Sequence, residues 1–71
     1  MKKYFIVIEP TKTGFSAYSS DLPGCVSTGQ TREEVERNRK EAISLHVDGL
    51  REEGQTVPEP QTYSVYIEVP A

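Results

Sequence analysis

The stretch that decides the fold is "TREEVERNRKEAISLHVDGLREEG", residues 31–54, which is typical of one long helix. Thr31 stands in the N-cap position before it, and Glu34 follows three residues later, the spacing of a capping box. Gly54 comes after the helix, where a left-handed glycine commonly ends one. We therefore predict a helix over about residues 32–53, with structural roles for Thr31 and Gly54.

The segments on both sides of this helix have the pattern of short strands. "KKYFIVIE" and "FSAYSS" flank the turn sequence "PTKTG", so residues 3–9 and 15–20 predict a hairpin. "CVSTG" predicts a third, short strand. After the helix, the two prolines of "QTVPEPQ" favour extended chain, and "TYSVYIEV" predicts a last strand. One face of that strand carries Tyr63, Val65, Ile67 and Val69.

The order of these elements predicts an α+β fold. Strands joined by short loops form an antiparallel meander, and a helical crossover normally returns the chain parallel to a strand of the same sheet. The free edge of the first strand is the natural place for the last one. We expect a β-β-β-α-β fold whose four-stranded mixed sheet has the order 3-2-1-4, with one helix on one face and a single domain over residues 1–71.

Size and cysteine content limit how such a domain is stabilised. A chain of 71 residues buries only roughly 60% of the surface that its unfolded form exposes, so its core is thin. One cysteine and one histidine provide neither a disulfide nor a zinc site, which leaves self-association as the usual support. A single cysteine also suits a reducing compartment, and no apolar stretch is long enough to span a bilayer. We expect a cytoplasmic protein without a membrane partner.

The charge balance argues against nucleic acid as a direct partner. The chain has 11 acidic and 8 basic residues, a net charge of −3, and no block of lysine and arginine. Its basic cluster is interleaved with glutamates on the predicted helix, which is typical of a solvated face; the cluster comprises Arg32, Arg37, Arg39 and Lys40. A basic protein partner suits this surface better than DNA or RNA.

The predicted sheet has more apolar surface than one helix can cover. The first strand is apolar on both sides, because Phe5 and Val7 alternate with the residues around them, and such a strand expects cover on both faces. The second strand presents Tyr18 opposite its other apolar residues. We expect an exposed tyrosine-containing face that another copy or a different protein covers. The candidates for self-association are Tyr4, Ile6, Ile8 and Tyr66.

The helix places two unusual residues on its apolar stripe. His46 falls within it, so we expect a neutral core imidazole bonded to the sheet backbone, to Ser44 or to Asn38; a general base or metal ligand is the alternative. Gly49 lies close beside the stripe, where close approach to the sheet would compensate for its poor helix propensity. Converging carboxylates are lacking as well, so we predict no catalytic residue, metal site or cofactor.

"DLPGC", residues 21–25, reads either as an active site or as a turn. Cys25 lacks a base at hand and more simply begins the third strand. Pro23 and Gly24 have the signature of a type II turn, which requires a positive φ at Gly24, and Leu22 anchors it. Asp21 either accepts backbone hydrogen bonds in the turn or faces a basic partner. Candidates for partner binding are Asp21, Leu22, Pro23, Gly24 and Tyr18.

From Asp21 to Pro60 the chain reads "DLPGCVSTGQTREEVERNRKEAISLHVDGLREEGQTVPEP", and after an N-terminal hairpin this run resembles the HicB-like antitoxin domain. The resemblance rests on "DLPGC", Ser27, Gly29, Thr31, Glu34, Asn38, Glu41, Ala42, Ile43, Leu50, Gly54, Pro58, Glu59 and Pro60. The resemblance implies a truncated RNase H-like fold, assembly as a dimer or tetramer, and a partner that is a small basic HicA-type toxin. Such toxins cleave mRNA with a catalytic histidine on a double-stranded-RNA-binding fold, and the antitoxin masks that site.

Two expectations about function follow from the resemblance. The first is a non-enzymatic antitoxin that neutralises such a toxin; the alternative is an orphan homo-oligomeric scaffold or small-ligand module without a toxin. Many members of the family also carry a C-terminal helix-turn-helix or ribbon-helix-helix domain that binds the operator. This chain ends at Ala71, directly after its last predicted strand, so we do not expect it to bind an operator alone.

Overall fold

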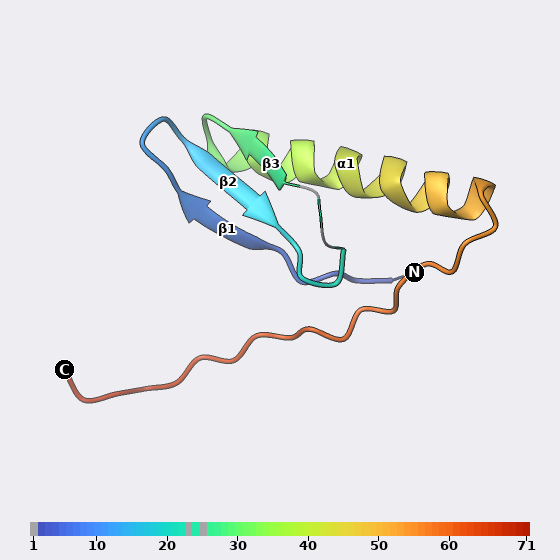
Figure 1. The fold of residues 1–71 in the computed structure, drawn as a ribbon. Coiled ribbons are helices and arrows are strands. Elements are labelled where there is room, and N and C mark those ends of the chain that lie inside the picture. Colours follow the sequence, from blue (N-terminus) through green and yellow to red (C-terminus); the bar gives the residue numbers. More distant parts are fainter. Residues whose placement is uncertain (1, 23, 25) are drawn as a thin grey trace.

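Three strands and one helix follow one another along the part of the chain that the structure describes (Figure 1). The computed structural model describes residues 2–22, 24 and 26–71. Its elements are β1 (Val7–Pro10), β2 (Phe15–Tyr18), β3 (Val26–Gly29) and α1 (Arg32–Glu52). The hairpin, the short third strand and the helix therefore lie where the sequence pattern predicts them, although β1 begins later than expected.

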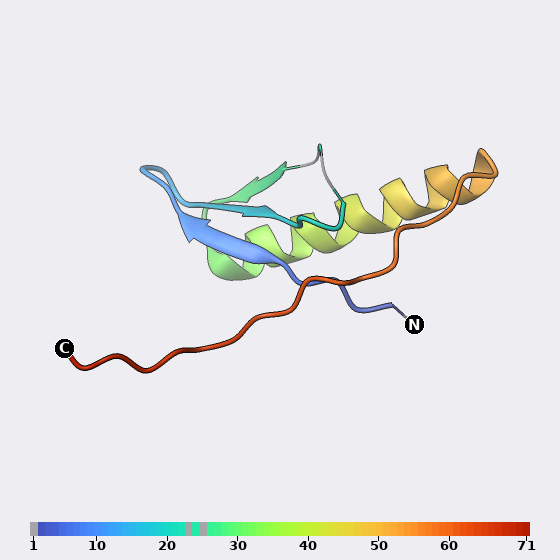
Figure 2. The same ribbon diagram turned by 60° about the horizontal axis from the view of Figure 1, so that its bottom comes forward.

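The sheet has one covered face and one open face. β1 pairs antiparallel with β2, and β2 pairs antiparallel with β3, in the order β1-β2-β3. α1 packs against β2 and β3 on one side only (Figure 2). Ala17 of β2 lies directly opposite Ser27 of β3, and both are buried beneath the helix. Leu22 and Val35 complete the buried apolar core of the described residues.

Local signals at both ends fix the extent of α1. The Thr31 hydroxyl accepts a hydrogen bond from the backbone N–H of Glu34 at 3.1 Å, the N-cap contact. At the other end Gly54 has a φ of +71°, and its N–H donates to the Arg51 carbonyl at 3.1 Å. The N–H of Gln55 donates to the Leu50 carbonyl at 2.8 Å, which completes a Schellman motif. α1 is not apolar enough to cross a membrane, and the described residues hold no other helix that could.

The predicted fourth strand is wrong, and with it the four-stranded mixed sheet of order 3-2-1-4. The described sheet has three strands, all antiparallel, and residues 55–71 are extended chain outside it. Pro58 and Pro60 lack the backbone N–H that a ladder needs. The hydroxyl of Tyr4 holds this segment by donating to the Pro58 carbonyl at 2.6 Å, so a whole tyrosine side chain separates it from the neighbouring backbone. Pairing requires strands only about 4.8 Å apart.

The second half of α1 extends past the sheet, and this places His46 and Gly49 differently from the prediction. The helix has 21 residues, or about 31 Å, whereas each strand has four residues, or about 13 Å (Figure 1). His46 has the helical angle of the apolar stripe but no strand beneath it, and its side chain is exposed. A Cβ at Gly49 would meet nothing within 4 Å. The predicted core imidazole and close approach to the sheet are therefore both wrong.

The close approach between helix and sheet occurs at Gly29 instead. A Cβ there would lie 2.5 Å from the backbone nitrogen of Val35 and 2.8 Å from its Cα. Contacts this short do not exist in real proteins, so only glycine lets the first turn of α1 sit at this distance from β3. Gly29 thus sets how closely the helix covers the sheet.

Candidate protein-binding surfaces

Asp21 holds the C-terminal segment against the loop that follows β2. Its carboxylate accepts hydrogen bonds from the backbone N–H groups of Gln61 at 3.3 Å and Thr62 at 3.2 Å, and from the Thr62 hydroxyl at 3.1 Å. Hydrogen bonds to a carboxylate are stronger than those between neutral groups. Of the two roles considered for Asp21, the structure has it accept backbone hydrogen bonds, but from residues 61–62 and not within its own turn. We call this arrangement the Asp21 clamp.

Further contacts join the segment that precedes Tyr63 to the body of the domain. The hydroxyls of Ser20 and Thr62 are 2.9 Å apart, and Tyr4 binds the Pro58 carbonyl. Lys2 and Glu59 form an ion pair, whose exposed position makes it worth no more than about 1 kcal/mol. Residues 58–62 are therefore part of the folded body, mainly through hydrogen bonds.

The rest of the "DLPGC" loop is divided between the core and the surface. Leu22 is buried, with its N–H bonded to the Ser19 carbonyl at 3.2 Å, so it anchors the loop and offers no side chain to a partner. Gly24 is exposed and has a φ of +87°, in the left-handed region that the sequence predicts for it. Pro23 and Cys25 lie outside the described residues, and the predicted turn type and strand start fall there with them.

The open face of the sheet carries an apolar row. Val7 lies directly opposite Tyr18, and Tyr18 directly opposite Val26, so the three side chains share the face that α1 does not cover. Tyr18 is 40% exposed and Val26 67% exposed. We call this row the outer sheet face. It contains Tyr18, which lies on β2 and is the one strand residue among the described candidates for partner binding.

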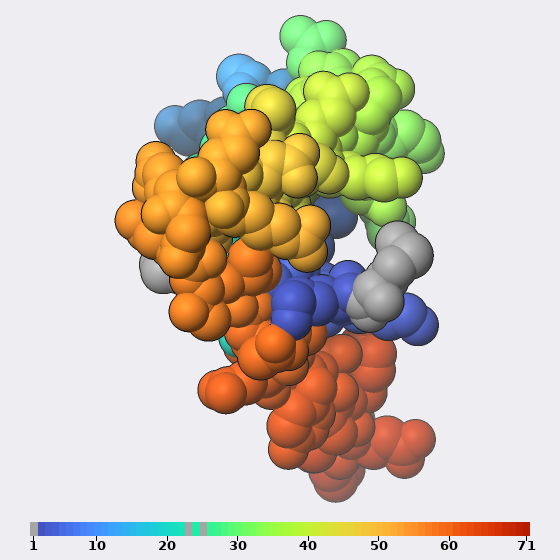
Figure 3. All heavy atoms as spheres, turned by 90° about the vertical axis from the view of Figure 1, so that its right-hand side faces the viewer, coloured from blue at the N-terminus to red at the C-terminus, as the bar shows by residue number. Residues whose placement is uncertain are grey.

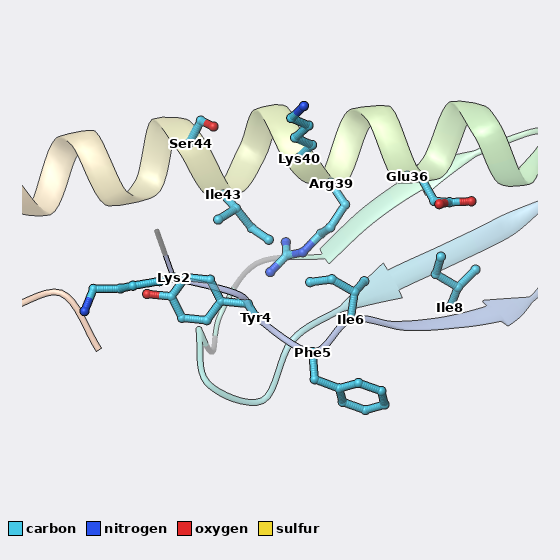
Figure 4. Close-up of a pocket in the computed structure, with 10 residues that line it drawn as sticks. All are labelled: Lys2, Tyr4, Phe5, Ile6, Ile8, Glu36, Arg39, Lys40, Ile43 and Ser44. Atoms are coloured by element: carbon cyan, nitrogen blue, oxygen red, sulfur yellow. The ribbon is translucent and has the colours of Figure 1, made fainter. Parts of the chain in front are cut away.

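A groove runs between the N-terminal segment and α1, on the opposite side from the outer sheet face (Figure 4). It has a volume of about 510 Å³ and is lined by Tyr4, Phe5, Ile6, Ile8, Ile43 and four polar or charged helix residues, with Lys2 at one end. Ile6 and Ile8 point toward the helix, whereas Phe5 points away. Figure 3 shows the hollow between the blue N-terminal segment and the helix. We call it the edge groove, because β1 pairs with β2 alone among the described residues.

The four candidates for self-association divide between two places. Tyr4, Ile6 and Ile8 line the edge groove, on the helix side and not on the open face where we expected them. Tyr66 lies in the C-terminal arm, which we define as residues 63–69. Apolar side chains of this arm are exposed to between 69% for Val65 and 98% for Tyr66. Among the described residues, none of the arm forms a hydrogen bond with the body.

Arg39 lines the edge groove, which the charge pattern of the sequence did not predict. Its side chain is only 2% exposed and points into the edge groove (Figure 4), although its charge suggests the solvated face. The spacing along the helix could have predicted this position, because Val35, Arg39 and Ala42 fall on one helical stripe. Its long apolar stem packs in that stripe while the charged group lies at the groove.

The amino-acid sequence matches a known protein family over nearly its whole length. Residues 4–71 match the family described as "HicB_like antitoxin of bacterial toxin-antitoxin system". The chain belongs to the HicB-like antitoxin family. The match includes the "DLPGC" loop, all of α1, the C-terminal arm and, apart from Lys2, the lining of the edge groove.

Similar curated proteins come from a phage, a bacterium and an archaeon. An uncharacterised 14.9 kDa protein of Haemophilus phage HP1 is 39% identical over 94% of this chain and 50% of its own length. UPF0150 proteins of Helicobacter pylori and Thermoplasma acidophilum are 48% and 32% identical, over 62% and 79% of this chain and 61% and 83% of their own lengths. The HicB-like chain thus spans about half of the phage protein and about three fifths of the H. pylori protein. No solved structure matches it significantly.

Proposed function

We propose that this HicB-like chain neutralises a small, basic HicA-type toxin by covering the active site with which the toxin cleaves mRNA. Its role is binding, without catalysis or a cofactor, and its place of action is the cytoplasm. Family membership supports an antitoxin role, and a net charge of −3 suits a basic partner. The same charge disfavours direct contact with nucleic acid.

The outer sheet face is the observation that carries this proposal. Tyr18 and Val26 are exposed side by side on neighbouring strands, and the cores of protein interfaces are apolar and enriched in aromatic residues. Glu9 lies on the same face, opposite Ser16, and brings an acidic group to its border. Asp21 is bonded to residues 61–62 and Leu22 is buried, so we assign the toxin contact on this face to Tyr18, with the exposed Gly24 as a further candidate.

Self-association is the second part of the proposed function. Only Ala17, Leu22 and Val35 form the buried apolar core of the described residues, which is little for a domain that stands alone. Assembly as a dimer or tetramer adds buried apolar surface that the single chain lacks. The outer sheet face remains available to the toxin if the copies associate elsewhere.

A binding and cleavage assay with the toxin from the neighbouring reading frame tests the proposal. The purified chain should stop mRNA cleavage at equimolar concentration, and Val26→Asp should weaken toxin binding at least roughly tenfold because it buries a charge in an apolar contact. Leu45→Asp is the matched control, since Leu45 is 74% exposed but lies on the helix, away from the outer sheet face. Full cleavage in the presence of the wild-type chain would instead favour the orphan scaffold or ligand-binding module.

A further inference from the structure

The single chain exposes far more surface than a compact protein of its mass. Its accessible surface is 5877 Å², against roughly 4,450 Å² for a folded monomer of 8.0 kDa, an excess of about 1,400 Å². Its radius of gyration is 14.0 Å, against roughly 11 Å for a compact chain of this length. The C-terminal arm is one source of this excess, because it projects from the body (Figures 1 and 3).

The arm has the pattern of a strand that buries one side. Its apolar row is Tyr63, Val65, Ile67 and Val69, and the alternate positions hold Ser64, Tyr66 and Glu68. Extended, its seven positions span about 23 Å. Exposed aliphatic side chains in such a row are uncommon on a surface that stays in water. The arm therefore requires an apolar surface of similar length.

The edge groove presents apolar side chains from both of its walls. Ile6 and Ile8 come from the strand side and Ile43 from the helix side, so an extended chain lying there would place alternate side chains against all three. The adjacent edge of β1 has no strand partner among the described residues, which leaves its backbone groups open to pairing. Addition of an extended segment to an open strand edge is a common mode of recognition.

We propose that the C-terminal arm of one copy occupies the edge groove of a second copy, and that the second copy returns its own arm to the first. This proposal builds on the self-association proposed above and names its contact. The apolar row lies in the groove over Ile6 and Ile8, the arm backbone runs along the free edge of β1, and Tyr66 faces outward. Each copy contributes one arm and one groove, so a twofold dimer closes without leaving either surface open.

Two observations favour a second copy as the occupant. The Asp21 clamp fixes Thr62 to its own body, and the arm leaves that body at the next residue, without a linker on which to fold back. Short hinges of this kind favour exchange between copies. The excess surface of about 1,400 Å² also exceeds the roughly 800 Å² per partner that a stable interface buries.

Sedimentation of full-length variants tests the proposal first. The wild-type chain should be a dimer at micromolar concentration, and the double variant Val65→Asp/Ile67→Asp should raise the dissociation constant at least roughly a hundredfold because both charges enter the groove. Tyr66→Asp is the matched control on the outward side of the same arm and should leave the dimer intact. None of these residues belongs to the core, so circular dichroism should show the same helix content in all variants.

Crosslinking between differently tagged copies tests the contact itself. In a Cys25→Ser background, Ile67→Cys on one copy and Glu36→Cys on the other should be joined by a short bismaleimide, because Glu36 lines the edge groove. Glu41→Cys is the control, since it is an exposed glutamate about 140° further round the same helix. Preferential crosslinking at Glu36 supports arm exchange; equal crosslinking at both positions contradicts it.

The possible failures are distinguishable. A wild-type chain that stays monomeric at all concentrations overturns both arm exchange and the proposed self-association. A dimer that survives Val65→Asp/Ile67→Asp overturns arm exchange alone. If that variant weakens toxin binding while the oligomeric state stays the same, the arm is a toxin contact and the proposal is wrong.

Discussion

At the scale of single residues, Asp21 illustrates how a suspected reactive acid can be a structural clamp. We predict that Asp21→Asn loosens residues 61–62, because an amide has one accepting oxygen where the carboxylate uses two, and loses the charge that strengthens these bonds. The expected cost is about 1–2 kcal/mol, seen as roughly tenfold faster hydrogen exchange at the Thr62 amide. Amides of the β1–β2 ladder should keep their protection.

The control for the Asp21 clamp is a substitution that removes a charge from the same C-terminal segment but leaves Asp21 unchanged. Glu59→Gln removes only the exposed ion pair with Lys2, so its effect on the same amide should be much smaller than that of the Asp21 variant. Equal effects of the two substitutions, or unchanged exchange in Asp21→Asn, would show that side chains other than Asp21 hold the segment.

At the scale of elements, substitutions of two glycines test how closely α1 packs on the sheet, because they should change the stability of the fold in opposite directions. Gly29→Ala should destabilise the fold by roughly 1–3 kcal/mol, because its Cβ would lie 2.5 Å from the backbone of Val35. Gly49→Ala is the matched substitution in open space and should stabilise by up to about 1 kcal/mol through helix propensity. In thermal unfolding each kcal/mol shifts Tm by about 4–8 °C, downward for the first variant and upward for the second. A rise in Tm with Gly29→Ala would contradict the close packing of α1 against β3.

The helix and strands of the fold could be predicted from the sequence only in part. The Thr31 and Gly54 ends of α1 are determined by contacts within a few residues, so their chemistry is visible in the sequence. The fourth strand was wrong because alternation shows that a segment can be a strand but not which edge accepts it. His46 was misplaced for a similar reason, since its angle on the helix was right but the length of the strands beneath it depends on the whole sheet.

The candidate surfaces were predictable in part. Tyr18 lies on the open face, as the pattern of β2 indicates, and Leu22 anchors its loop as expected. The Asp21 clamp joins residues 40 and 41 positions apart, which local pattern does not encode. The edge groove also combines β1 with α1, so its position could be known only after the strand face that meets the helix was established.

At the scale of the whole molecule, the thin core and the large exposed surface make stability depend on protein concentration. If arm exchange supplies the missing burial, unfolding is coupled to dissociation and mass action raises Tm with concentration. For two chains of 71 residues, each tenfold increase should raise Tm by about 5 °C. Scanning calorimetry at micromolar to millimolar concentrations measures this shift. The Val65→Asp/Ile67→Asp variant should have a lower Tm that does not change with concentration, whereas a constant Tm for the wild-type chain would mean that one copy is stable with its arm exposed.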